Sequence, residues 1–328
     1  LVSESLFSLA NEHQGVRGFF EEGYAGESLV GVYVNGIYEE RFTEGSAYKG
    51  ISRRLAFMVN TVNWLATHLE VDGEVLDLAT SRISDFRREL DFRTGELRRA
   101  FTWETRHGKR LRLEFRRILS MRRPELACQQ VGMTPLNFSG EAGLSMGLDF
   151  SIPHRAFGTN FWNIARRAEL ALLGVSVSIG QRLFAGMHID APVSWRPLEG
   201  EKYSGAQMAL PLTEGQETLV GRSVILHTAR QPQQPLEEAW EQGMEQLHAG
   251  CPSYAEVYAQ NQAYWTVFWR KADIVIEGDE ENQQGIRFCI FQMHQTYRGV
   301  VDGANIGAKG LTGEAYNGNA FWDTETYC

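Results

Sequence analysis

The chain has 328 residues, 43% of them apolar, and a formal net charge of −9 at pH 7. This length exceeds one typical domain and fits two, and the apolar content is ample for a core. The acidic balance excludes a nucleic-acid binder, because phosphate contacts need clustered Lys and Arg. No run of about 18 apolar residues occurs, which excludes a membrane-spanning helix.

The cysteines favour a cytoplasmic protein. They are far apart and show no CxxC pairing: Cys128, Cys251, Cys289 and Cys328. In a chain of this size they indicate reduced thiols rather than a disulfide frame or a zinc site. His188-x-Asp190 has no further ligands nearby, so no metal is expected. The chain opens at Leu1 without a basic-then-apolar leader; we expect neither a signal peptide nor a native start there.

Residues 1–230 show the two-residue alternation of half-buried strands. Leu90 and Phe92 alternate, Thr94-Gly95 supplies a turn, and Phe101 continues the pattern, which predicts a hairpin. Residues 111–116 predict another strand. Residues 51–69 fit either a strand pair or a short helix.

Further strands are expected later in this region. Val175, Val177 and Ile179 alternate with serines, and residues 219–227 are again strand-like. The basic pairs at residues 98–99 and 116–117 are interpreted as solvated strand faces or bulges. Gly, Pro, Asn and Asp recur every ten or so residues, so the pattern predicts a large antiparallel sandwich.

The periodicity becomes helical after the Pro- and Gln-rich residues 231–235. A helix over 236–247 ends before Gly250, and Ser253 with Glu256 forms a capping box for a second helix. Residues 274–276 are strand-like. Asp279 caps a third helix, whose apolar face is expected to contain Ile286, Cys289, Ile290, Met293 and Tyr297. His294, beside that face, is interpreted as a satisfied buried histidine.

Three blocks of sequence carry a resemblance. The first is residues 4–18 (ESLFSLANEHQGVRG) with 33–38 (YVNGIY). The second is residues 269–278 (WRKADIVIEG) with 284–288 (QGIRF), and the third is residues 307–316 (GAKGLTGEAY) with 321–325 (FWDTE). Together they resemble glycoside hydrolase family 65, and the resemblance follows the whole chain in order.

The resemblance implies an architecture of β and α domains. Residues 1–230 would form an N-terminal antiparallel β-sandwich, residues 231–272 a helical linker, and residues 273–328 the start of an (α/α)6 catalytic barrel. The last segment is long enough for about two helices with their loops. It therefore leaves the barrel incomplete and would expose apolar surface on its own.

The resemblance also implies an activity. The parent protein would be a phosphorylase that splits an α-glucosidic disaccharide, of the kojibiose or maltose type, into β-glucose 1-phosphate and a sugar with inversion. Inorganic phosphate would be the co-substrate, with no cofactor, and the family implies a homodimer. Two alternatives stay open: a hydrolase of the same family that uses water, and a non-catalytic sandwich fragment for carbohydrate binding or dimerisation.

Four residues are candidate substrate ligands. Trp322 and Asp323 match the family's pair that holds the transferred glucosyl unit, since an indole offers an apolar wall and a carboxylate accepts from adjacent hydroxyls. Without the flanking match they would be a core Trp beside a helix-capping Asp. Lys309 either lines the pocket or is a solvated loop lysine. Glu314 either touches substrate or fixes the loop.

The catalytic groups are expected elsewhere. The resemblance places the general acid, a Glu, beyond Cys328, together with the phosphate ligands, so Glu325 is not assigned that role and the 328 residues alone should be inactive. Asn319 departs from the His that many family members have there. In the first block, Arg17 is expected to tie loops together around a structural turn.

Overall fold

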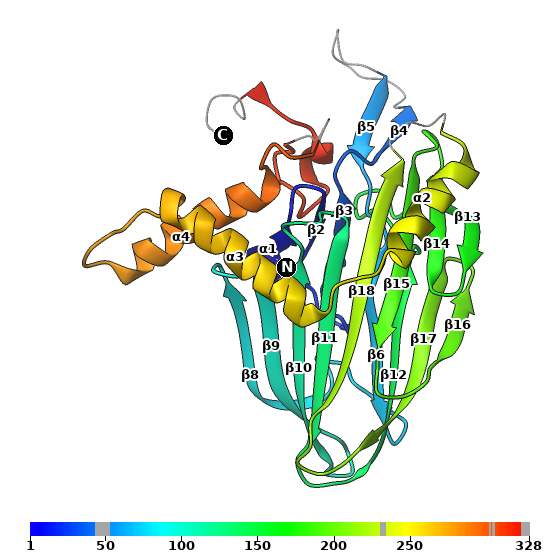
Figure 1. The fold of residues 1–328 in the computed structure, drawn as a ribbon, viewed down its shortest axis with the longest axis vertical. Helices are drawn as coiled ribbons and strands as arrows, with labels where there is room; N and C mark the ends of the chain where they lie inside the picture. Colours follow the sequence, from blue (N-terminus) through cyan, green and yellow to red (C-terminus); the bar gives the residue numbers. More distant parts are fainter. Residues whose placement is uncertain (43–52, 230–233, 302, 304–305, 323–328) are drawn as a thin grey trace.

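The computed structural model describes residues 1–42, 53–229, 234–301, 303 and 306–322. Within these residues, two antiparallel sheets pack face to face (Figure 1). Apolar side chains from both inner faces, such as Leu113 and Leu144, belong to one buried cluster. The predicted antiparallel sandwich is therefore confirmed.

The larger sheet has eight strands in the described residues. Its order is β13 (Trp162–Ala168), β14 (Ala171–Ser176), β15 (Arg182–Asp190), β18 (Thr218–Ala229), β11 (Leu126–Pro135), β10 (Arg110–Leu119), β9 (Glu96–Glu104) and β8 (Arg82–Asp91). The facing sheet runs β16 (Arg196–Gly200), β17 (Tyr203–Leu212), β12 (Gly140–Asp149), β6 (Asn63–Val71) and β7 (Glu74–Val75).

Two small sheets lie at one end of the sandwich in the described part of the chain. They contain β1 (Leu9–Ala10), β2 (Gln14–Val16) and β3 (Val32–Val34) in one sheet, and β4 (Tyr38–Phe42) and β5 (Arg54–Met58) in the other. The stretch 51–69, as far as it is described, thus holds strands rather than a helix: β5 and the greater part of β6, which pair with other strands in different sheets and not with each other. Residues 9–18, which we call the N-terminal strap, follow the short helix α1 (Val2–Leu6).

Helices cover the outer face of the larger sheet (Figure 1). In α2 (Leu236–His248), Trp240 packs on Phe184 of β15 with ring centroids 5.4 Å apart. In α3 (Tyr254–Ala272), the predicted Ser253–Glu256 capping box is present. Asn261 of α3 donates to the carbonyl of Leu119, which fixes the helix against the end of β10.

The last long helix, α4 (Glu280–Thr296), begins at the predicted cap Asp279 but packs through a different face from the predicted one. Phe291 and Gln295 are buried, whereas Cys289 and Met293 are exposed. The reason is tertiary, because Phe291 stacks on Trp265 of α3 at 4.6 Å between ring centroids.

Two strand predictions are wrong in detail. Residues 274–276 form no strand, since the Gln283 side chain bonds both the Ile276 amide and the Ile274 carbonyl, at 2.7 and 2.8 Å. The strand at Val175 ends at Ser176, and Val177 lies in the turn that follows. The predicted boundary at residue 230 falls outside the described residues, and the domain limits stay predictions.

The basic pairs were predicted to be solvated, and for two of the four arginines this is wrong. Arg99 and Arg117 are 3% and 1% exposed, because they alternate to the covered side of β9 and β10. The Arg99 guanidinium bonds Glu22 and Glu21, each at 2.6 Å. Burial alone would lower the pKa of Arg99, but Glu22 and Glu21 raise it above its usual range.

In the described part of the chain, no helix is long and apolar enough to cross a membrane.

We expect Arg99→Met to destabilise the sandwich by about 3–5 kcal/mol, because it leaves the buried Glu22 carboxylate without its cation and removes one of the two arginines beside Glu21. Arg98→Met is the matched control. Arg98 is next to Arg99 in the chain, but its side chain is 42% exposed and pairs with Glu114, so its loss should change stability by less than about 1 kcal/mol. Urea unfolding followed by near-UV circular dichroism measures both. Equal losses in the two variants would contradict the role of Arg99.

Candidate functional site

The candidate site is the loop of residues 307–318, which we call the site loop, and the described residues that follow it up to Trp322. The site loop lies against the small sheets at one end of the sandwich, red beside blue in Figure 1. It closes on itself, since the Ala308 amide bonds the Asn319 carbonyl at 3.1 Å. Tyr316 and Asn317, in the 3-10 turn η1 (Ala315–Gly318), have left-handed φ of 60° and 59°. This tight path is available to few sequences.

The strap supports the site loop directly. The Arg17 guanidinium donates to the Thr312 carbonyl at 2.6 Å, which confirms that Arg17 ties loops together. Gly15 lies so close that a Cβ there would sit 2.2 Å from the Leu311 carbonyl oxygen. Leu311 itself is buried, in a cluster with Tyr33. Only glycine permits this approach of backbone to backbone.

A second contact holds the end of the site loop. The Tyr38 hydroxyl of β4 donates to the Gly318 carbonyl at 2.7 Å. Gly318 has a φ of +69°, and a Cβ there would meet Met58 at 2.6 Å. The loop is therefore held at Thr312 and again at Gly318.

The strap also holds the end of α4, from which the site loop departs. The Glu12 carboxylate, fully buried, accepts from the amides of Gly299 and Val300 at 3.0 and 3.1 Å. Gln295 bonds the Ala10 amide through its side chain at 2.8 Å. Glu12 has a φ of 71°, a strained value for a residue with a Cβ, which its several partners maintain.

The four predicted ligands lie in different environments. Trp322 is 78% exposed within the described residues. Asp323 lies outside the described residues. Lys309 is exposed and sits over the Tyr316 ring, 5.5 Å from its centroid. Glu314 is buried, with 8% of its surface exposed.

Lys309 and Glu314 are brought together at one cavity of about 670 Å³. Arg17 of the strap and Arg155, in the segment between β12 and β13, also line it. Trp322 is not among its lining residues, so this cavity and the exposed indole are separate features. Sequence reasoning missed Arg155, because nothing near it in the chain indicates a contact with residue 314.

Glu314 is held by the sandwich rather than turned to solvent. Its Oε2 accepts from the Arg155 amide at 2.7 Å, while Oε1 is buried without a hydrogen-bond partner among the described residues. Burial raises the pKa of Glu314 to about 7, against the opposing attraction of Arg155. A carboxyl in such a place changes its charge near neutral pH.

His154 is a neighbour of Glu314 but not its ion-pair partner. The two side chains approach to 3.5 Å between Nδ1 and Oε2. However, burial lowers the pKa of His154 to about 4, and its Nδ1 accepts from the Ala156 amide at 3.2 Å. The imidazole is therefore neutral, with its proton on Nε2. His294 is also neutral, because burial lowers its pKa to about 4, and it bonds the Tyr264 hydroxyl at 2.6 Å.

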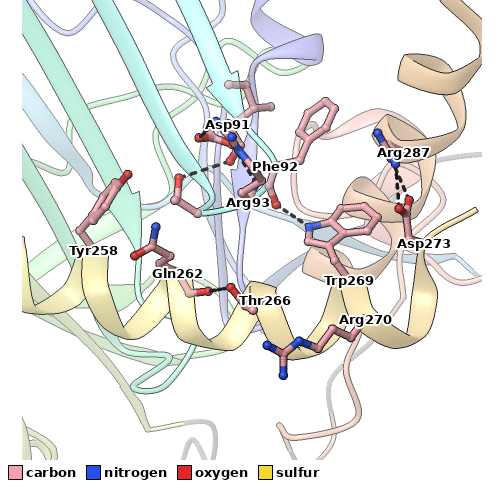
Figure 2. Close-up of a pocket in the computed structure, with 12 residues that line it drawn as sticks. Asp91, Phe92, Arg93, Tyr258, Gln262, Thr266, Trp269, Arg270, Asp273 and Arg287 are labelled. Atoms are coloured by element: carbon pink, nitrogen blue, oxygen red, sulfur yellow. Dashed lines mark hydrogen bonds and ion pairs between the residues drawn. The ribbon is translucent and has the colours of Figure 1, made fainter. Parts of the chain in front are cut away.

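A larger cavity, of about 800 Å³, lies between the β8–β9 turn and α3 (Figure 2). Two ion pairs line it: Arg93 with Asp91, and Arg287 with Asp273 at 2.7 and 2.8 Å. The Trp269 indole bonds the Phe92 carbonyl at 2.7 Å. None of the three described ligand candidates, Lys309, Glu314 and Trp322, lines this cavity, so its volume alone does not make it the candidate site.

The described residues hold no group of three His, Cys, Asp or Glu side chains that could share a metal ion. The site loop contributes Lys309 and Glu314, and Trp322 follows it in the chain; a lysine and a carboxyl can bind hydroxyl groups, and an indole can bind the apolar face of a sugar.

Comparison with known proteins assigns the family. Residues 1–268 match the N-terminal domain of glycosyl hydrolase family 65, and residues 287–328 match the central catalytic domain of that family. The chain belongs to glycosyl hydrolase family 65. The resemblance inferred from the three sequence blocks is thereby confirmed.

Relatives of known name are phosphorylases. The chain is 33% identical to a maltose phosphorylase of Bacillus subtilis (strain 168) and 28% identical to an α,α-trehalose phosphorylase of Thermoanaerobacter brockii, over 99% of its length in both cases. A solved structure titled putative kojibiose phosphorylase from human microbiome superposes on all of it with a TM-score of 0.94 and 35% identity. The chain spans 44%, 45% and 44% of these proteins.

We expect Gly15→Ala to loosen the site loop, because its Cβ would overlap the Leu311 backbone, an overpacking that costs about 1–3 kcal/mol. Hydrogen exchange of the amides at residues 308–313 should accelerate by about tenfold or more. Gly285→Ala in α4 is the control, since a Cβ there meets nothing within 4 Å. Unchanged exchange in Gly15→Ala would contradict the close contact.

Proposed function

We propose that the whole protein is an inverting phosphorylase that splits an α-glucosidic disaccharide of the kojibiose or maltose type into β-glucose 1-phosphate and a sugar. The observation that carries this proposal is the match to named phosphorylases along nearly the whole chain. Phosphorolysis of disaccharides is common to those named relatives. Inversion and the β product rest on the family resemblance.

We assign Trp322 and Asp323 to the glucosyl unit that is transferred. The position of this pair in the segment that matches the family's central catalytic domain supports this assignment, because an indole face can stack on a sugar ring. We keep Lys309 as a cavity-lining ligand. Glu314 is better suited to fixing the loop than to touching substrate, because its bonded oxygen faces the Arg155 amide.

The reaction needs an acid on the leaving oxygen and a nucleophile on the opposite face of the ring. Phosphate is already an anion and can attack without a catalytic base, provided that cationic and amide donors hold it. We propose that the acid, a glutamate, and the phosphate ligands come from the part of the relatives' length that this chain does not span. No cofactor is needed. A homodimer and a cytoplasmic location remain predictions.

The test is to incubate the whole protein with kojibiose, maltose and trehalose, with and without phosphate. We expect phosphate-dependent formation of β-glucose 1-phosphate from one of them, identified by NMR of the anomeric proton. Equal glucose release with and without phosphate, and no sugar phosphate, would favour the hydrolase. Turnover by residues 1–328 alone would contradict the placement of the acid.

We expect Trp322→Ala to lower kcat/KM by at least about tenfold, or ~1.4 kcal/mol, because the sugar loses its apolar wall. Trp322→Phe keeps an aromatic face and should recover part of the loss. Val177→Ala, at a residue 54% exposed in the turn after β14, is the control and should leave kcat/KM unchanged. Steady-state kinetics measure kcat/KM in each variant. A wild-type kcat/KM in Trp322→Ala would contradict the assignment of Trp322 to the sugar site.

A further inference from the structure

Two hydrogen bonds from different parts of the sandwich hold the site loop, at Thr312 and at Glu314. Arg17 of the strap bonds the carbonyl of Thr312, and the Arg155 amide bonds the carboxyl of Glu314. The strap and Arg155 belong to different parts of the sandwich, separated by more than a hundred positions in the chain. Two such contacts fix both the position and the rotation of a short segment, whereas one would leave it free to turn.

The first contact, from Arg17 to Thr312, is supported by buried residues of the sandwich. Arg17 is 6% exposed, and its own carbonyl accepts from the guanidinium of Arg117 at 2.9 Å. Arg117 is 1% exposed and lies 3.5 Å from Glu21. A continuous series of bonds thus runs from Arg117, near the end of β10, through Arg17 to Thr312. Rigid, buried donors of this kind hold a loop more accurately than exposed ones.

The second contact depends on a buried carboxyl. Glu314 has one oxygen on the Arg155 amide and the other without a partner among the described residues. The charged and titratable groups around it come from three elements and its own loop: His154 and Arg155 between β12 and β13, Tyr33 of β3, Arg17 of the strap, and Lys309.

We infer that Arg17 and Glu314 are positioning residues that clamp the site loop to the sandwich and so set the place of Trp322. This inference rests on the proposed function for its kinetic consequence. Trp322 lies eight positions after Glu314 in the chain, and the Tyr38–Gly318 bond holds the chain between them. A sandwich residue can therefore control sugar affinity without touching the sugar. Misplacement of a binding group by about 1 Å can reduce activity by as much as 10²-fold.

The contacts of Arg17 and Glu314 that hold the site loop on the sandwich, which we call the clamp, should weaken as pH rises. Burial raises the pKa of Glu314 to about 7 in the docked loop, above its ordinary value of 4.5. The docked loop therefore binds a proton more tightly than a released one, and docking weakens as pH rises through 7. The lowered pKa of His154 acts oppositely, but only below its ordinary value of 6.5. Between pH 6.5 and 8.5, Glu314 determines the change.

The experiment compares Glu314→Gln, Glu314→Ala, Arg17→Lys and Arg17→Ala in the whole protein at saturating phosphate. The two alanine variants should raise KM for the disaccharide by about tenfold and change kcat by less than about threefold, since they weaken binding and leave the chemistry intact. Arg17→Lys keeps one donor for the Thr312 carbonyl, so its KM should lie between those of wild type and Arg17→Ala. Glu141→Gln and Arg110→Lys, at exposed strand positions, are the matched controls and should match wild type.

The pH series is the second readout. Wild-type KM should rise between pH 6.5 and 8.5, whereas Glu314→Gln, which still accepts from the Arg155 amide and cannot ionise, should show a flatter rise. This comparison keeps the inference testable even when Glu314→Ala fails to fold. A 100-fold fall in kcat with unchanged KM in either alanine variant would overturn the positioning role, as would parallel pH profiles for wild type and Glu314→Gln.

Hydrogen exchange separates the two proposals. Faster exchange of residues 308–318 in Arg17→Ala and Glu314→Ala supports the clamp even when no disaccharide is phosphorolysed, a result that would reject only the proposed function. Unchanged exchange beside normal phosphorolysis would reject only the clamp.

Discussion

The hydrogen bond from the Arg17 guanidinium to the Thr312 carbonyl joins the beginning of the described chain to its end. It depends in turn on Arg117, which holds the Arg17 carbonyl from within the larger sheet. In the strap, the Glu12 carboxylate also accepts from the amides of Gly299 and Val300, just after α4. One short segment therefore fixes both the residues that follow α4 and the site loop. Removing the strap would release both.

This dependence explains why charged side chains lie deep in the sandwich. A buried ion pair is weak evidence for stability, since desolvation offsets most of the attraction. What the Arg99 and Arg117 group provides is direction: each guanidinium bonds in a fixed plane, so Glu21, Glu22 and the strap have one arrangement that satisfies them. The sandwich thereby acts as a rigid support for the loop that carries the candidate sugar ligand.

Much of the fold follows from local pattern. The alternation at residues 111–116 predicts β10, and Ser253 with Glu256 predicts the start of α3, because strand faces and helix caps depend on neighbours in sequence. The predicted face of α4 failed for the opposite reason. Its contact with Trp265 is set by how α3 crosses the sheet, which no periodicity within α4 encodes.

The sequence by itself determined the family, the sandwich and the segment that holds the site loop, since those rest on local motifs and their order. It could not show that Glu314 bonds the Arg155 amide, or that Arg99 and Arg117 are buried while Arg98 is not. Those answers depend on partners far away in the chain: Arg155 is 159 positions from Glu314, and Arg17 is 295 positions from Thr312. Burial and charge state are properties of such distant neighbours, so only the tertiary structure decides them.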